Sequence, residues 1–148
     1  MMLVLLFVHV ASTLFMVGLI WFVQVVHYPL FAAVGPAHFE AYERNHQRLT
    51  TWVVAPVMLA EVLTAVALLT TQTTIATVMQ WCGMGLLGLI WGCTAGLSVP
   101  AHRQLESGFQ SNAYRRLVST NWIRTAAWTI RGAIVLALLQ QVLTGVHS

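Results

Sequence analysis

Four long apolar stretches dominate this sequence and restrict what it can fold into. They run over residues 3–28, 51–70, 76–99 and 121–143, with polar segments between them. Each reaches the roughly 20 residues that cross a hydrocarbon core of about 30 Å. Because lipid offers the backbone no hydrogen-bonding partners, such segments must be helices. The sequence therefore predicts an all-α integral membrane four-helix bundle, with Pro29 and Pro100 just beyond the ends of the first and third helices.

The composition supports a single transmembrane domain over residues 1–148 and excludes other classes of protein. Hydrophobic residues make up 58% of the chain and charged residues 7%, against about 25% charged residues in soluble domains. A soluble enzyme, a disordered chain and a disulfide-stapled secreted domain are therefore excluded. The net charge of +3 is too small to predict nucleic-acid binding. The expected partners are the lipid bilayer and a lipophilic small molecule.

The arginines predict how the protein is oriented in the membrane. Six of the seven lie at the face that holds the two long connections, about 29–50 and 100–120: Arg44, Arg48, Arg103, Arg115, Arg116 and Arg124. By the positive-inside rule this face is cytoplasmic, and both termini are on the outer side of the cell membrane. We also expect two amphipathic helices at the cytoplasmic interface, one over 37–48 and one around Tyr114, Leu117 and Val118.

An internal repeat relates the two halves of the chain. The sequence GLIW at 18–21 returns unchanged at 88–91, and the same offset of 70 carries Trp52 onto Trp122. Each copy, about 1–70 and 71–148, holds two spans, so the copies have the same orientation in the membrane. Such parallel repeats are related by an axis along the membrane normal. The sequence thus predicts a pseudo-twofold bundle of two helical hairpins.

The same offset carries Glu61 onto Arg131, and these are the predicted catalytic residues. Each lies nine residues past Trp52 or Trp122, about 14 Å deep at 1.5 Å per residue. A lone charge at that depth costs at least about 2.5 kcal/mol, so the two are expected to pair inside the bundle. Glu61 would then be a proton acceptor tuned by Arg131. The alternative is a structural ion pair that fixes the register of the helices.

Polar residues converge on the cytoplasmic end of the bundle and form the best candidate for a ligand site. The predicted substrate- or cofactor-binding residues are His27, Gln24, Asn121, Arg124, Trp52, His46 and His102. Glu43 and His46 form a Glu-x-x-His motif, which ligates metals in some helical bundles. The weak metal candidates are therefore His27, Glu43, His46 and His102, against the alternative of a solvated face.

Two further features concern a cofactor and self-association. His9 and His27 share one stripe of the first span, and either could be an axial ligand of a haem; the alternative is a histidine bonded to a carbonyl group. Gly88, Gly92 and Gly96 recur every four residues, which allows close helix approach within the bundle or in a homodimer.

Two resemblances to known families extend over most of the chain. Residues 99–105 (VPAHRQL) and 121–125 (NWIRT) resemble small four-span membrane proteins similar to fungal anthrone oxygenases. The chain is also similar to HemJ-type protoporphyrinogen oxidases at Trp21, Phe22, Pro29, Glu43, Arg44, Arg48, Leu49, Pro56, Met58, Tyr114, Arg115 and Asn121. Both resemblances imply oxidoreductase chemistry on flat, hydrophobic aromatic substrates that partition into the bilayer.

Two classes of function therefore remain open. The first is a membrane oxidoreductase or oxygenase-like enzyme whose lipophilic aromatic substrate enters the bundle. The second is a non-enzymatic binding or accessory protein, or a proton-coupled carrier, in which Glu61 and Arg131 form a structural pair.

Overall fold

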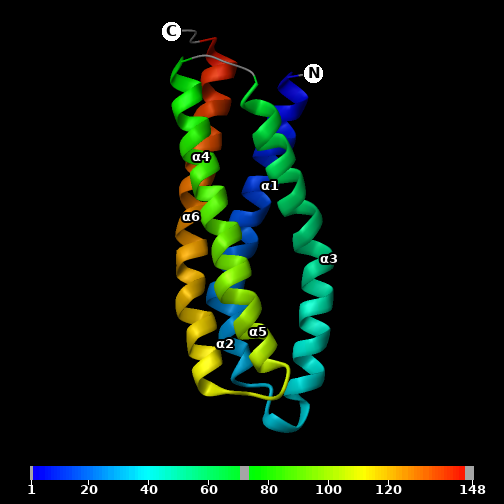
Figure 1. Cartoon of the computed structure of the whole chain (residues 1–148). Coiled ribbons are helices and arrows are strands. Elements are labelled where there is room, and N and C mark those ends of the chain that lie inside the picture. The colour runs from blue at the N-terminus through cyan, green and yellow to red at the C-terminus, as the bar shows by residue number, and fades with distance from the viewer. Residues whose placement is uncertain (1, 71–73, 146–148) are drawn as a thin grey trace.

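The computed structural model describes residues 2–70 and 74–145, and these form helices joined by short connections (Figure 1). Two of the segments are π-helical, η1 and η2. The order is α1 (Met2–Phe22), η1 (Val23–His27), α2 (Tyr28–Phe31), α3 (Pro36–Leu68), α4 (Thr74–Cys93), η2 (Thr94–Ser98), α5 (Val99–Leu105) and α6 (Ser111–Thr144).

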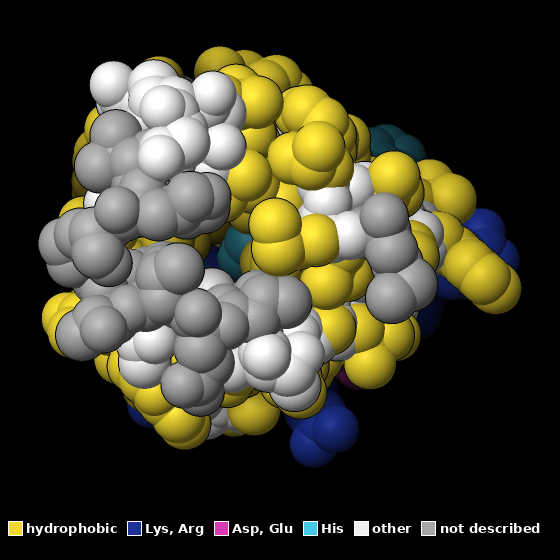
Figure 2. Space-filling model, turned by 90° about the horizontal axis from the view of Figure 1, so that it is seen from above, with side chains coloured by type: hydrophobic (Ala, Val, Ile, Leu, Met, Phe, Trp, Pro, Cys, Tyr) yellow, Lys and Arg dark blue, Asp and Glu magenta, His cyan; other side chains and the backbone are white. Residues whose placement is uncertain are grey.

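Four helical stretches are long and apolar enough to cross a membrane, as the sequence predicts. They are Met2–Phe31, Pro36–Leu68, Thr77–Leu105 and Ser111–Thr144. Their outer faces are apolar: Trp52, Leu63 and Val4 are among the most exposed side chains. Hydrophobic side chains also cover much of the described surface seen from the end that carries the termini (Figure 2). Such a surface suits lipid rather than water.

The long helices begin and end at the two ends of the bundle. The start of α1, the end of α3, the start of α4 and the end of α6 are at one end, and the connections before α3 and before α6 are at the other (Figure 1). The separate interfacial helices predicted for the latter end are not present. Residues 37–48 are the first turns of α3, and Tyr114, Leu117 and Val118 belong to α6. Gly35, with φ of 77°, and Pro36 start α3, and no helix-breaking residue interrupts it before its apolar part.

Each of the two π-helical segments is followed closely by a proline. Proline lacks an N–H group and its ring clashes with the carbonyl group four residues earlier. The helix can widen to a π-turn at that point and continue. Pro29 follows η1 and Pro100 follows η2. The helices were predicted to end before these prolines, but they run on to Phe31 and Leu105.

The helices pack unevenly around the bundle axis. The segment α1 packs against both α3 and α6, and α4 packs against α6, whereas α3 and α4 touch each other little. Trp128, Met16 and Ile90 are buried in the central cluster of apolar side chains. Gly132 of α6 packs tightly against α1, since an added Cβ would lie 3.1 Å from Cγ2 of Val17. The weak contact between α3 and α4 leaves room for a cavity.

Candidate functional site

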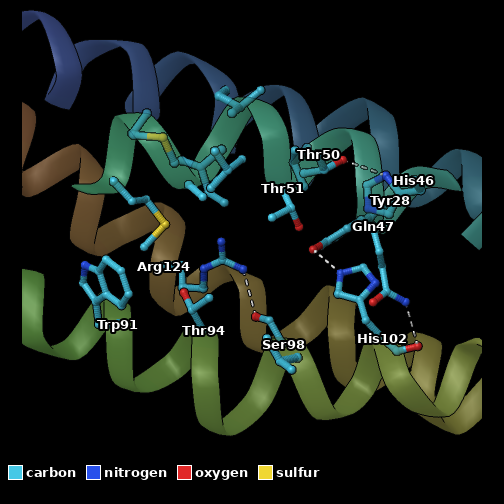
Figure 3. Close-up of a pocket in the computed structure, with 18 of the residues that line it drawn as sticks. Tyr28, His46, Gln47, Thr50, Thr51, Trp91, Thr94, Ser98, His102 and Arg124 are labelled. Carbon is cyan, nitrogen blue, oxygen red and sulfur yellow. Dashed lines mark hydrogen bonds between the residues drawn. The ribbon is translucent and has the colours of Figure 1, made fainter. Parts of the chain in front are cut away.

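A cavity of about 340 Å³ lies between α3 and the α4–η2–α5 stretch, against α1 and α6. That volume is at the lower end of the range typical of small-molecule sites. Most of its lining is apolar, and Leu59 and Val99 at its edge are exposed on the outer surface of the bundle. The polar residues that line it are Tyr28, His46, Gln47, Thr50, Thr51, Thr94, Ser98, His102 and Arg124 (Figure 3).

Arg124 on α6 projects its guanidinium group into this cavity (Figure 3). The residue is only 8% exposed. Its Nη1 donates a hydrogen bond of 2.8 Å to Oγ of Ser98, and its Cζ lies 5.4 Å from the ring centroid of Trp128. The Nε atom is buried without a hydrogen-bond partner. Among the described residues no carboxylate pairs with Arg124, so a buried cation faces an apolar cavity without an anion.

The hydrogen-bond acceptor of Arg124 depends on the proline in the same stretch. Ser98 is the last residue of η2 and lies two residues before Pro100. A π-turn changes the direction in which side chains leave the helix, and such turns are frequent at functional sites. The widened segment presents Thr94 and Ser98 to the cavity together.

Three side chains from different elements form a hydrogen-bonded chain beside the cavity. Nδ1 of His102 lies 2.5 Å from Oε1 of Glu43, and Nε2 of His102 lies 3.2 Å from the hydroxyl group of Tyr28. Gln47 donates a hydrogen bond of 3.1 Å to the same Glu43 oxygen. Glu43 is fully buried, and its Oε2 has no partner. The chain joins a buried carboxylate to a tyrosine that lines the cavity.

The other two histidines predicted for this site contact each other. Nε2 of His27 lies 2.9 Å from Nδ1 of His46, which also lies 3.1 Å from the hydroxyl group of Thr50. The ring centroids of His46 and His102 are 5.4 Å apart. Even so, within residues 2–70 and 74–145 no group of three or more His, Cys, Asp or Glu side chains could hold a metal ion. The weak metal candidates therefore gain no support.

Glu61 and Arg131 form the predicted ion pair outside the cavity. Nε and Nη2 of Arg131 each lie 3.0 Å from Oε1 of Glu61. Thr13 donates to the same oxygen at 3.0 Å, and Trp128 donates to Oε2 at 3.1 Å. The other Arg131 nitrogen, Nη1, donates to the carbonyl oxygen of Gly83. Both Glu61 oxygens accept hydrogen bonds, and neither residue lines the cavity. The catalytic role of the pair stays a prediction.

The two histidines considered as haem ligands both contact polar side chains of the protein. Nδ1 of His9 lies 2.8 Å from the hydroxyl group of Thr64, and the void beside His9 measures about 20 Å³. His27 is turned towards His46 and is not part of the cavity lining. The residues present therefore do not fit a haem at either position.

The remaining predicted site residues lie away from the cavity. Nδ2 of Asn121 donates a hydrogen bond of 2.8 Å to Gln24, whose own amide donates to the carbonyl oxygen of Val118. This pair ties η1 to α6. Trp52 is 77% exposed on the outer face of α3. Of the seven predicted ligand-binding residues, the structure brings Arg124, His46 and His102 to the cavity.

Six polar residues of the cavity were not predicted from the sequence to bind a ligand. They are Tyr28, Gln47, Thr50, Thr51, Thr94 and Ser98, and all line the cavity. A signal existed for two of them, because Tyr28 directly precedes Pro29 and Ser98 lies two residues before Pro100. A proline inside a membrane helix marks a place where side chains are redirected.

The glycine stripe is not used for packing within the chain. Gly88, Gly92 and Gly96 are exposed, and an added Cβ at any of them would meet nothing within 4 Å. A homodimer through this stripe stays a prediction.

Comparison with known proteins gives no match. No family model matches the chain, and no curated protein or solved structure is significantly similar to it. The two family resemblances therefore remain predictions.

Proposed function

We propose that this protein binds a lipophilic small molecule in the cavity between α3 and α4, with an acidic oxygen group of that molecule held by Arg124. The single observation that carries the proposal is the buried guanidinium group of Arg124, which faces the cavity without a carboxylate partner. Burying a charge is costly unless it is paired. An anionic ligand would supply the missing partner, and a guanidinium is well shaped to bind two oxygens.

The shape and lining of the cavity support a ligand that arrives from the lipid. Its edge residues Leu59 and Val99 lie on the apolar outer surface. Most of its wall is apolar, including Met16, Met58 and Trp91. A molecule that partitions into the bilayer can therefore enter between α3 and α4, bury its apolar body against these side chains and reach Arg124 with its polar end.

The test uses a matched pair of fluorescent aromatic probes. Anthracene-9-carboxylate and the neutral 9-anthracenemethanol are titrated against the protein in nanodiscs of zwitterionic lipid, with empty nanodiscs as the blank. We expect saturable binding of the carboxylate and weaker binding of the alcohol. Arg124→Gln should weaken carboxylate binding by at least about tenfold, since it removes one partner of a buried charge pair.

The control variant is Arg116→Gln, which removes an exposed arginine of the same helix. It should bind the carboxylate like the wild type. If the wild type bound anthracene-9-carboxylate and 9-anthracenemethanol with equal affinity, that result alone would contradict the proposal. Undiminished binding of the carboxylate by folded Arg124→Gln protein would also contradict it.

An enzyme of the oxidoreductase or oxygenase-like class is the second candidate. The observation that favours it over a pure binding protein is the hydrogen-bonded chain of Glu43, His102 and Tyr28 beside the cavity, because acid–base groups at a ligand site are typical of catalysis. The aromatic substrate class follows from the two family resemblances. In this proposal Glu61 and Arg131 hold the helices in register.

Two further proposals concern the architecture. We propose that the end carrying the exposed arginines is cytoplasmic, because positive charge is retained there during insertion. We also propose that the bundle is a repeated hairpin. In its support, η1 precedes Pro29 and η2 precedes Pro100, and the residues Ile20 and Ile90, which the offset of 70 relates, are both buried.

A further inference from the structure

We propose that Tyr28, His102 and Glu43 form a proton relay that takes the proton from a weakly acidic ligand in the cavity, so that the ligand is bound as its anion at Arg124. The inference rests on the proposed function and deepens it. It assigns the ligand to the class of phenols or enols, which are neutral in water at pH 7, rather than to strong acids that are already ionised.

The hydrogen bonds define the direction of the relay. The buried Glu43 carboxylate accepts at 2.5 Å from Nδ1 of His102, so that the imidazole proton belongs on Nδ1. Nε2 is then an acceptor, and it faces the hydroxyl group of Tyr28 at 3.2 Å. This order of carboxylate, imidazole and hydroxyl group is the arrangement in which a histidine acts as a base and the carboxylate orients it.

The charges around the cavity favour the transfer. Among the described residues Glu43 has no arginine partner, and Arg124 has no carboxylate partner. The site thus contains a buried anion at one end and a buried cation at the other. Moving a proton from the ligand to His102 places an imidazolium beside Glu43 and an anion beside Arg124. Both buried charges are then paired, which lowers the cost of burying them.

The step is a transfer of protons only and leaves no atom unaccounted for. The O–H bond of the ligand breaks as its proton passes to the oxygen of Tyr28. The original O–H bond of Tyr28 breaks at the same time, and that proton forms the new N–H bond at Nε2 of His102. Tyr28 ends as it began, and the proton resides on His102.

The surroundings of each group are compatible with this role. Tyr28 and Arg124 both line the cavity and lie close enough to interact electrostatically. A ligand oxygen at Arg124 is therefore near the hydroxyl group that would accept its proton. Gln47 donates to the carbonyl oxygen of His102 at 3.4 Å, and the rings of His46 and Phe31 lie beside its ring, with centroids 5.4 and 6.3 Å away. His27 is close enough to interact electrostatically with His102 and Glu43.

The experiment uses 2-naphthol, a phenol whose anion has a distinct absorption band. The intact protein in nanodiscs is titrated with 2-naphthol at pH 7 in weakly buffered solution that contains a pH indicator. We expect the bound probe to absorb as naphtholate, with no proton released to the solution, because His102 retains it. In Tyr28→Phe and His102→Gln the bound probe should stay neutral. The exposed histidine variant His38→Gln should behave like the wild type.

The outcomes separate this inference from the proposed function. A wild-type protein that binds 2-naphthol in its neutral form overturns the relay, and so does naphtholate formation with one proton released per ligand. If anthracene-9-carboxylate still binds in an Arg124-dependent way, the proposed function stands in either case. Naphtholate formation that persists in folded Tyr28→Phe and His102→Gln proteins would also overturn the relay.

Discussion

Arg131 and Glu61, seventy positions apart in the chain, share a hydrogen bond of 3.0 Å at the centre of the bundle, and neither residue is more than 1% exposed. The pair joins α6 to α3, two helices that are not consecutive in the chain. The carbonyl oxygen of Gly83 extends the contact to α4, and Thr13 extends it to α1. All four long helices therefore meet at one ion pair.

Breaking that pair should destabilise the bundle. Glu61→Gln leaves the Arg131 charge buried and unpaired, for which we expect a loss of about 3 to 5 kcal/mol in the free energy of unfolding. The measurement is unfolding in detergent followed by circular dichroism. The exposed glutamate variant Glu40→Gln should change stability little. The double variant Glu61→Gln with Arg131→Met should lose less than Glu61→Gln alone, and a stable single variant would contradict the structural role.

Gly132 should be intolerant of a side chain. An added Cβ would lie 3.1 Å from Cγ2 of Val17, at the contact between α6 and α1. Gly132→Ala should therefore cost about 1 to 3 kcal/mol of stability through overpacking, and Val17→Ala should recover part of the loss. Gly88→Ala is the matched control, because nothing lies within 4 Å of that position. Equal effects of the two glycine variants on thermal unfolding would argue against this helix contact.

Pro100 should affect ligand binding without contacting the ligand. Pro100→Ala removes the ring clash that widens η2, so Ser98 should turn away from Arg124. Losing that hydrogen bond should weaken binding of anthracene-9-carboxylate by about three- to tenfold. The control is Pro56→Ala, because α3 shows no π-turn at Pro56. If Pro100→Ala bound the carboxylate with unchanged affinity, the π-turn would not be needed to position Ser98 for ligand binding.

Labelling of introduced cysteines tests the orientation of the protein. In a background with Cys82 and Cys93 replaced by alanine, a membrane-impermeant maleimide is added to intact cells. Ser107→Cys, in the connection before α6, should be labelled only after the cells are opened, whereas Thr144→Cys should be labelled at once. The reverse pattern would show that the arginine-rich end faces outwards.

The sequence predicted the class of fold and the central ion pair because both follow from the cost of polar groups in lipid. Apolar length determines the spans, and Glu61 and Arg131 each lie nine residues after a tryptophan, Trp52 and Trp122. The prediction of separate interfacial helices was wrong, because amphipathic patterning near residues 37–48 cannot distinguish a surface helix from the first turns of a longer helix. The structure instead starts α3 at Pro36 and continues without a break.

The site was predicted only in part for a related reason. Arg124, His46 and His102 stand out as charged or titratable residues in an apolar chain, and all three line the cavity. Ser98 and Thr50 are small hydroxyl residues without a motif. Their position depends on how the helices pack and on the π-turn of η2, and that information is tertiary. The opening between α3 and α4 likewise has no signature in the sequence.

The most direct test of the account is a distance between ligand and protein measured by solid-state NMR. Anthracene-9-carboxylate labelled with ¹³C at its carboxylate is bound to protein with ¹⁵N-labelled arginine in lipid, and carbon–nitrogen dipolar dephasing is recorded. If the carboxylate pairs with Arg124, we expect strong dephasing, because the charged groups of an ion pair lie within about 4 Å of each other. The dephasing should persist in Arg116→Gln and vanish in Arg124→Gln. Bound carboxylate without dephasing, or dephasing that survives in Arg124→Gln, would contradict the account.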